Sequence, residues 1–169
     1  MFPFKRFTYL YLPKHQNKLV VPVNEGQYIV ISSLFFMAPG IYSFILQHYK
    51  LSFLLFLCSA VSVNYWIYPI YGWRRNLDLL YAKFVFSVFF CNGVYYIRSI
   101  SGYSGLCALV YCYYMSNKLC PLPDKEPDKE PDKEIPKLVP WYKYHMMFHA
   151  IMTYELFIIL KSKRINITN

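Results

Sequence analysis

The segment Trp141–Leu160, W-Y-K-Y-H-M-M-F-H-A-I-M-T-Y-E-L-F-I-I-L, decides the fold class of this chain. It is about 20 residues long and mostly apolar, roughly the length with which an α-helix crosses the hydrocarbon layer of a bilayer. It also carries His145 and His149, which stand one helical turn apart and share one helix face. Ionisable side chains are costly inside a membrane and normally face protein or a water-filled cavity. The segment therefore predicts a membrane-spanning helix with a polar site on one face.

The histidine pair has two interpretations. Imidazoles at positions i and i+4 of a helix are a common way to offer two nitrogen ligands to one metal ion, and zinc is a frequent partner of such ligands. Alternatively, the same side chains hydrogen-bond neighbouring helices and hold the bundle together. The spacing alone leaves both interpretations open.

Composition places the whole chain among membrane proteins. Of its 169 residues, 56% are hydrophobic and 21% are aromatic, and the apolar residues fall in long runs. The net charge of +9 comes from lysines and arginines between those runs, as expected when positive links orient a membrane protein, so we expect no nucleic-acid partner. The five cysteines include no C-x-x-C pair, which argues against a zinc ribbon or a disulfide framework.

The apolar runs predict an all-α fold, a polytopic membrane helix bundle of about five transmembrane helices. The first four helices are expected within residues 27–118 and the fifth at residues 141–160. The predicted spans are Gln27–Leu46, Leu51–Tyr71, Asp78–Ile97, Tyr103–Met115 and Trp141–Leu160. The pair Pro39-Gly40 inside the first span predicts a kink there.

Three segments lie outside the predicted helices. Residues 1–26 are basic and aromatic, and we expect them at the membrane surface without a cleaved signal peptide. Residues 119–140 are predicted to form a disordered linker, because three tandem P-D-K-E copies between Pro123 and Glu134 contain no apolar side chain other than the prolines. Residues 161–169 are expected to be a short basic tail. The count of lysines and arginines places the N-terminus and the linker on the cytosolic side.

Five spans would bring the end of the second helix and the starts of the third and fifth to one side of the membrane. Most polar side chains of these segments then lie about 6 to 13 Å below the membrane surface. Asp78 of the third helix lies at the surface itself, in a first helical turn where the macrodipole favours an acidic side chain. The set comprises Ser62, Asn64, Tyr65, Asp78, His145 and His149. Because scattered packing residues would have no reason to match in depth, we expect one shared site. Glu155 lies deeper, on another face, and we expect a partner such as a tyrosine hydroxyl.

A Ser near the end of an early span, an Asp that opens the next and H-x-x-x-H in the last resemble the alkaline ceramidase and progestin/adiponectin-receptor superfamily. The resemblance implies a multi-span membrane hydrolase that binds zinc through three histidines and cleaves a lipid amide. It implies that His145 and His149 are zinc ligands. It also implies that Asp78 positions or activates the catalytic water, and that Ser62 supplies a supporting hydroxyl of the catalytic site.

The third histidine of that superfamily has no counterpart here. In its place, a few residues after the Ser, the run S-V-N-Y-W (Ser62 to Trp66) carries Asn64 or Tyr65, and neither an amide nor a phenol is a usual zinc ligand. Two expectations follow: a zinc-dependent lipid amide hydrolase, in active or degenerate form, or a non-catalytic membrane protein that binds a membrane lipid or scaffolds a partner. In both cases the protein is expected to be integral and multi-pass, with an endomembrane favoured.

Overall fold

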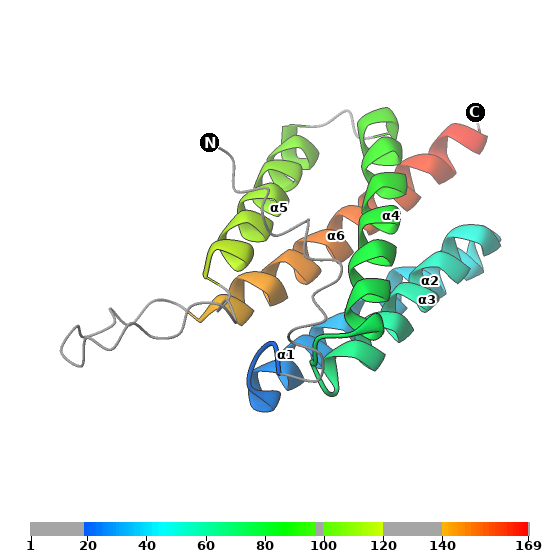
Figure 1. The fold of residues 1–169 in the computed structure, drawn as a ribbon. Coiled ribbons are helices and arrows are strands. Elements are labelled where there is room, and N and C mark those ends of the chain that lie inside the picture. Colours follow the sequence, from blue (N-terminus) through cyan, green and yellow to red (C-terminus); the bar gives the residue numbers. More distant parts are fainter. Residues whose placement is uncertain (1–18, 97–99, 120–139, 169) are drawn as a thin grey trace.

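The computed structural model describes residues 19–96, 100–119 and 140–168 (Figure 1). Within these ranges the chain is all-helical, as predicted, and its only β-type pairing is an isolated bridge between Leu19 and Ile70. The elements in chain order are α1 (Val23–Ser33), η3 (Leu34–Phe36), α2 (Met37–Ile45), α3 (Tyr49–Trp66), α4 (Trp73–Tyr96), α5 (Ile100–Leu119) and α6 (Trp141–Thr168). The P-D-K-E repeats lie outside the described residues.

The first apolar run is one helical path from Val23 to Ile45, with a short 3-10 turn, η3, in its middle. The turn lies directly before Pro39, which has no N–H to donate to the carbonyl of Phe35. This break is close to the predicted kink. α2 ends at a tight turn in which Gln47 takes a φ of 62° and the His48 N–H donates to the Ser43 carbonyl at 2.9 Å. The chain thereby turns back, and α3 packs beside α2.

Several helix ends differ from the predicted ones. α4 begins at Trp73, because the Asn76 N–H already donates to the Gly72 carbonyl at 3.2 Å and closes a first turn. The prediction that Asp78 opens this helix and caps its first turn is therefore wrong, and Asp78 lies buried inside α4. α5 is longer at both ends than the predicted fourth span. α6 continues to Thr168, so the predicted tail is helical up to that residue.

Two helices organise the packing. α6 contacts α1, η3, α2, α4 and α5, whereas α3 contacts α1, η3, α2 and α4. In Figure 1, α6 runs obliquely behind α4, and α5 lies along the first half of α6. α5 meets only α6 among the described helices. The main apolar core lies where η3, α3, α4, α5 and α6 meet, and its most buried members include Leu55, Val85, Leu109 and Leu156.

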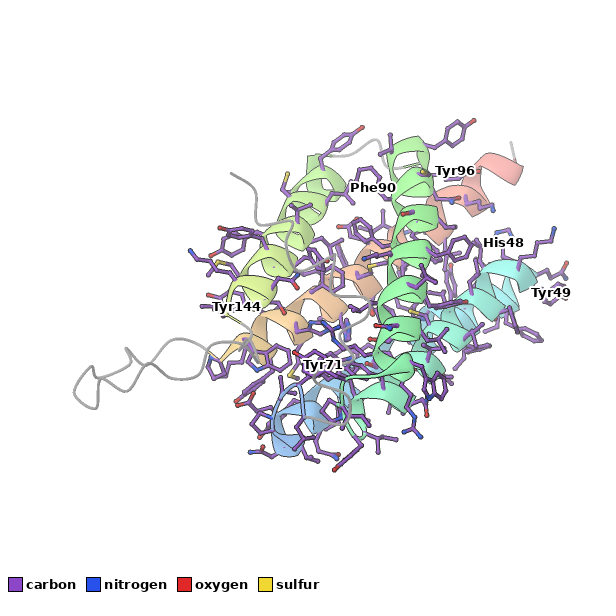
Figure 2. The ribbon with its side chains drawn as sticks, in the orientation of Figure 1. His48, Tyr49, Tyr71, Phe90, Tyr96 and Tyr144 are labelled. Carbon is purple, nitrogen blue, oxygen red and sulfur yellow. The ribbon has the colours of Figure 1, made fainter. Side chains whose placement is uncertain are left out.

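Polar side chains lie beside the apolar core inside the bundle, and many large apolar side chains are exposed on its outside. Phe53, Ile45 and Phe84 are exposed, as are Tyr49 and Phe90, which are labelled in Figure 2. The buried polar side chains are those of Ser32, Ser33, Ser43, Ser52, Ser59, Ser62, Asp78, Ser116, His149 and Glu155.

Two helical stretches of the described chain are long and apolar enough to cross a membrane, namely Val23–Ile45 and Trp73–Tyr96. The central helix of a soluble protein can pass the same test, but such a helix is mostly buried. Here only 39% and 22% of the most apolar part of each stretch is buried. Most residues in these parts thus lie at the surface of the described structure, which supports a membrane protein.

Candidate functional site

The first turns of α6 carry the two histidines on the face that is turned into the bundle. The ring centroids of His145 and His149 lie 4.7 Å apart, with an angle of 71° between the ring planes. The His149 side chain is only 5% exposed, and its ring meets the edge of Phe36. The spacing of one turn therefore brings the imidazoles together, as the sequence predicts.

Each histidine is held by a serine on a different neighbouring helix. Nδ1 of His149 lies 2.9 Å from the Ser32 hydroxyl on α1, and Nδ1 of His145 lies 3.1 Å from the Ser116 hydroxyl on α5. These contacts fix the orientation of both rings and engage one nitrogen of each. Nε2 is the nitrogen that remains on each ring for a further ligand.

Ser62 and Asp78 meet between α3 and α4. The hydroxyl of Ser62 and the indole N–H of Trp66 both donate hydrogen bonds to the Asp78 carboxylate, and the positive charge of Arg75 acts on the same group. Ser62 and Trp66 are one turn apart on α3, so both reach the same carboxylate from one helix face. The structure thus brings Asp78 and Ser62 together.

Adjacent serines of α1 connect these two groups. The Ser33 hydroxyl lies 2.9 Å from the Ser62 hydroxyl, whereas the Ser32 hydroxyl faces His149. Both Ser32 and Ser33 also reach the Ile29 carbonyl, at 3.1 and 2.7 Å. We call the connected set the polar centre. It comprises Ser32, Ser33, Ser62, Asp78, Ser116, His145 and His149, and it joins α1, α3, α4, α5 and α6.

Trp66, two residues after Asn64 and directly after Tyr65, contacts the histidine pair. Its side chain is 7% exposed, and its ring meets the edge of the His145 ring at a centroid distance of 5.5 Å. The same side chain donates a hydrogen bond to Asp78, so Trp66 contacts both the histidine pair and the Ser62–Asp78 pair. Asn64 is exposed, and Tyr65 is buried in the cluster of Trp66 and Trp141. The spacing i, i+4 from Ser62 would have identified Trp66.

A second set of contacts lies beside the polar centre, at the start of α6. The Trp141 indole N–H donates to a carboxylate oxygen of Glu25 on α1 at 2.6 Å, and its ring stacks on Trp66 at 5.7 Å. Tyr28 stacks on Tyr142 at 4.9 Å. α1 and α6 are therefore joined by aromatic contacts directly beside the histidines.

A zinc site of the catalytic type needs three protein ligands that converge on one point. The described residues contain no group of three His, Cys, Asp or Glu side chains that could hold a metal ion. His145 and His149 supply two imidazoles, and the Asp78 carboxylate is engaged by Ser62 and Trp66. The donor set within the described part of the chain therefore does not fit zinc.

Ser32, Ser33, Ser116 and Trp66 are members or neighbours of the site that the sequence analysis missed. The serines lie within apolar runs, where small polar residues at helix contacts are common, so nothing in the sequence distinguishes them from packing residues. Glu155 lies apart from the polar centre, against Gly105 on α5.

In the comparisons with known proteins, no family model, no curated protein and no solved structure matches this chain.

Proposed function

We propose that this chain is a multi-pass membrane protein whose helical path Val23–Ile45 and helices α3, α4, α5 and α6 each cross the bilayer. The many large apolar side chains exposed on the outside of the bundle support this, because lipid would cover that apolar surface at no cost. The polar centre also supports it, since hydrogen bonds between buried side chains are a usual means of joining helices in lipid.

The function that these residues support best is a non-catalytic one, on a framework that resembles the ceramidase-like hydrolases in degenerate form. The observation that carries this proposal is Trp66, which contacts both the His145 ring and the Asp78 carboxylate. An indole N–H donates but offers no lone pair to a metal ion. In this proposal the polar centre joins the helices, and the protein binds membrane lipid through its apolar surface.

An activity assay tests this proposal. The purified full chain in lipid nanodiscs would be incubated with a long-chain N-acyl amide in the presence of added zinc, and free fatty acid would be measured. The expected result is the same release for the wild-type chain and for His149→Ala, equal to the protein-free rate. Release by the wild-type chain that His149→Ala abolishes would contradict the non-catalytic proposal.

Zinc-dependent hydrolysis of a lipid amide is the second candidate, and the adjacent histidines favour it. The imidazoles lie 4.7 Å apart, and each uses Nδ1 for a serine, which is how metal-binding histidines are commonly held. A third ligand would have to come from elsewhere in the chain. His48 cannot be that ligand. Partial burial, and then the positive charge of Lys163, lower the pKa of His48, so His48 lies near Lys163 at the far end of α6 from His145 and His149. Figure 2 shows His48 at the opposite end of α3 from Tyr71.

The remaining histidine, His15, lies outside the described residues. The second candidate would therefore need His15 as the third nitrogen ligand. A zinc measurement on His15→Ala separates the two candidates. If the wild-type chain binds zinc and His15→Ala loses it, the hydrolase candidate gains its missing ligand. If neither protein binds zinc, the non-catalytic candidate stands.

A further inference from the structure

Glu155 is a buried carboxyl group that takes no part in the polar centre. Its side chain is only 3% exposed, and neither carboxylate oxygen has a hydrogen-bond partner in the described part of the chain. The tyrosine hydroxyl that the sequence analysis expected is not beside it. An ionisable side chain in such a position is costly to keep and is a common sign of a functional group in a membrane protein.

The carboxyl group of Glu155 lies in a notch that Gly105 leaves on α5. A Cβ atom placed on Gly105 would collide with the carboxylate oxygen Oε1 and with the carboxyl carbon. A side chain at position 105 would therefore displace the carboxyl group of Glu155 from this place, whereas glycine leaves room for it, as small residues do at helix contacts in membranes. Another α5–α6 pair, Ser116 with His145, fits the same antiparallel register.

Among the described residues, no titratable side chain occupies the helix positions that surround Glu155. The neighbours one turn away are Ile151, Met152, Ile158 and Ile159 on α6 and Gly102, Ala108 and Leu109 on α5. The titratable side chains nearest in sequence, which are those of Tyr103, Cys107 and Tyr154, are exposed on the outer surfaces. From α4, the phenols of Tyr81 and Tyr96 pack on the same apolar core. Glu155 thus sits in an apolar seam between α5 and α6.

We propose that Glu155 is a proton-binding site, and that the neutral carboxyl group holds α5 against α6. An unpaired carboxylate in an apolar seam would cost several kcal/mol, and a bound proton removes that charge. α5 meets no other described helix, so the α5–α6 seam is its main described contact. Loss of the proton would charge the notch and loosen α5.

The same seam connects Glu155 to the polar centre. Ser116 on α5 holds Nδ1 of His145, so a loosened α5 would also release that ring. Proton binding at Glu155 would thereby control whether the His145 ring keeps its orientation. This inference does not depend on whether the protein binds zinc.

The first test asks whether the carboxyl group is neutral. The full chain in lipid nanodiscs at pH 7 would be treated with a hydrophobic carbodiimide, which reacts with protonated carboxyl groups in apolar surroundings, and the adduct would be located by peptide mass spectrometry. The expected result is an adduct at Glu155 in the wild-type chain and its loss in Glu155→Gln. Absence of the adduct at Glu155 in the wild-type chain would overturn the proposal.

The second test asks whether the proton holds α5, and it uses two native cysteines of that helix. Cys112 is buried and Cys107 is exposed, so the ratio of their labelling by a membrane-permeant maleimide reports on α5, and the same ratio measured in Glu155→Gln is the baseline for the pH dependence of the two thiols. The ratio of Cys112 to Cys107 labelling is expected to rise roughly tenfold from pH 6 to pH 10 in the wild-type chain, which corresponds to about 1.4 kcal/mol.

Three variants complete this design. Glu155→Gln keeps the shape of the side chain without the charge, so its ratio should stay low at both pH values. Gly105→Ala should remove the pH response of the ratio, because the added Cβ takes the place of the flexible end of Glu155 and displaces its carboxyl group, and the matched control Gly72→Ala should behave as the wild-type chain, since nothing lies within 4 Å of its Cβ. A wild-type ratio that stays constant up to pH 10, or an equal rise in Glu155→Gln, would overturn the proposal.

Discussion

The exchange Ser32→Ala probes the polar centre most sharply. It removes the hydroxyl that lies 2.9 Å from Nδ1 of His149 and leaves a buried imidazole nitrogen without that partner. An unsatisfied buried polar group costs about 1 to 3 kcal/mol, and hydrogen bonds between membrane helices reach at most about 1.7 kcal/mol. We therefore expect a loss of about 1 to 2 kcal/mol in the free energy of unfolding. For a chain of this size that lowers Tm by about 2 to 8 °C.

The assay is thermal unfolding of the full chain in detergent micelles, followed by the fluorescence of the buried tryptophans. Ser87→Ala is the matched control, because the Ser87 hydroxyl is exposed and donates only to the Lys83 carbonyl of its own helix. Its free energy of unfolding should change by less than about 0.5 kcal/mol. Equal Tm values for Ser32→Ala and Ser87→Ala would refute the idea that the polar centre stabilises the bundle.

A double-mutant cycle separates the hydrogen bond from the loss of packing. When His149 is replaced by Leu, the Ser32 hydroxyl keeps the Ile29 carbonyl as an acceptor at 3.1 Å, so no buried donor is left without a partner. Adding Ser32→Ala to His149→Leu should therefore cost much less than Ser32→Ala alone. Additive losses would place the effect outside the Ser32–His149 contact.

Three further predictions concern the frame around the polar centre. Gly26→Ala should destabilise the bundle, because its Cβ would lie 2.8 Å from the Trp66 carbonyl oxygen, whereas Gly72→Ala should not, and thermal unfolding of both variants checks this. Deletion of two P-D-K-E copies from 123–134 should leave expression and membrane insertion unchanged, as measured by fractionation. Cysteines placed in the repeats and in the tail 161–169 should label from opposite sides of sealed vesicles, and labelling of both from one side would contradict five spans.

The sequence predicted the helices well and their ends less well. The helix predicted over Trp141–Leu160 is confirmed by α6, but among the described residues only Val23–Ile45 and Trp73–Tyr96 are long and apolar enough to cross a membrane, so the span predicted for α6 stays a prediction. The start of α4 was missed because Trp73 to Leu77 is polar and basic, and hydropathy does not register the backbone bond that closes its first turn. Helix ends depend on such local bonds more than on apolar content.

The candidate site shows a similar division. The pairing of His145 with His149 follows from helical spacing, and the meeting of Asp78 with Ser62 was expected because the predicted topology places the end of the second helix and the start of the third on the same side of the membrane. Trp66 was not predicted because the position after Ser62 was expected to hold a metal ligand, and an indole does not bind a metal ion. The surroundings of Glu155 were not predicted either. The carboxyl group lies against Gly105, which has no side chain, whereas the sequence suggested a polar side chain as its neighbour.

The central claim is that Trp66 stands where a third metal ligand would be needed, and the zinc content of Trp66→His tests it most directly. Wild-type chain and variant would be purified in detergent, dialysed against micromolar zinc and measured by elemental analysis. We predict well below one zinc per chain for the wild type and about one for Trp66→His, because the new imidazole would complete a three-histidine set with His145 and His149. One zinc per chain in the wild type, or no gain in Trp66→His, would contradict the account.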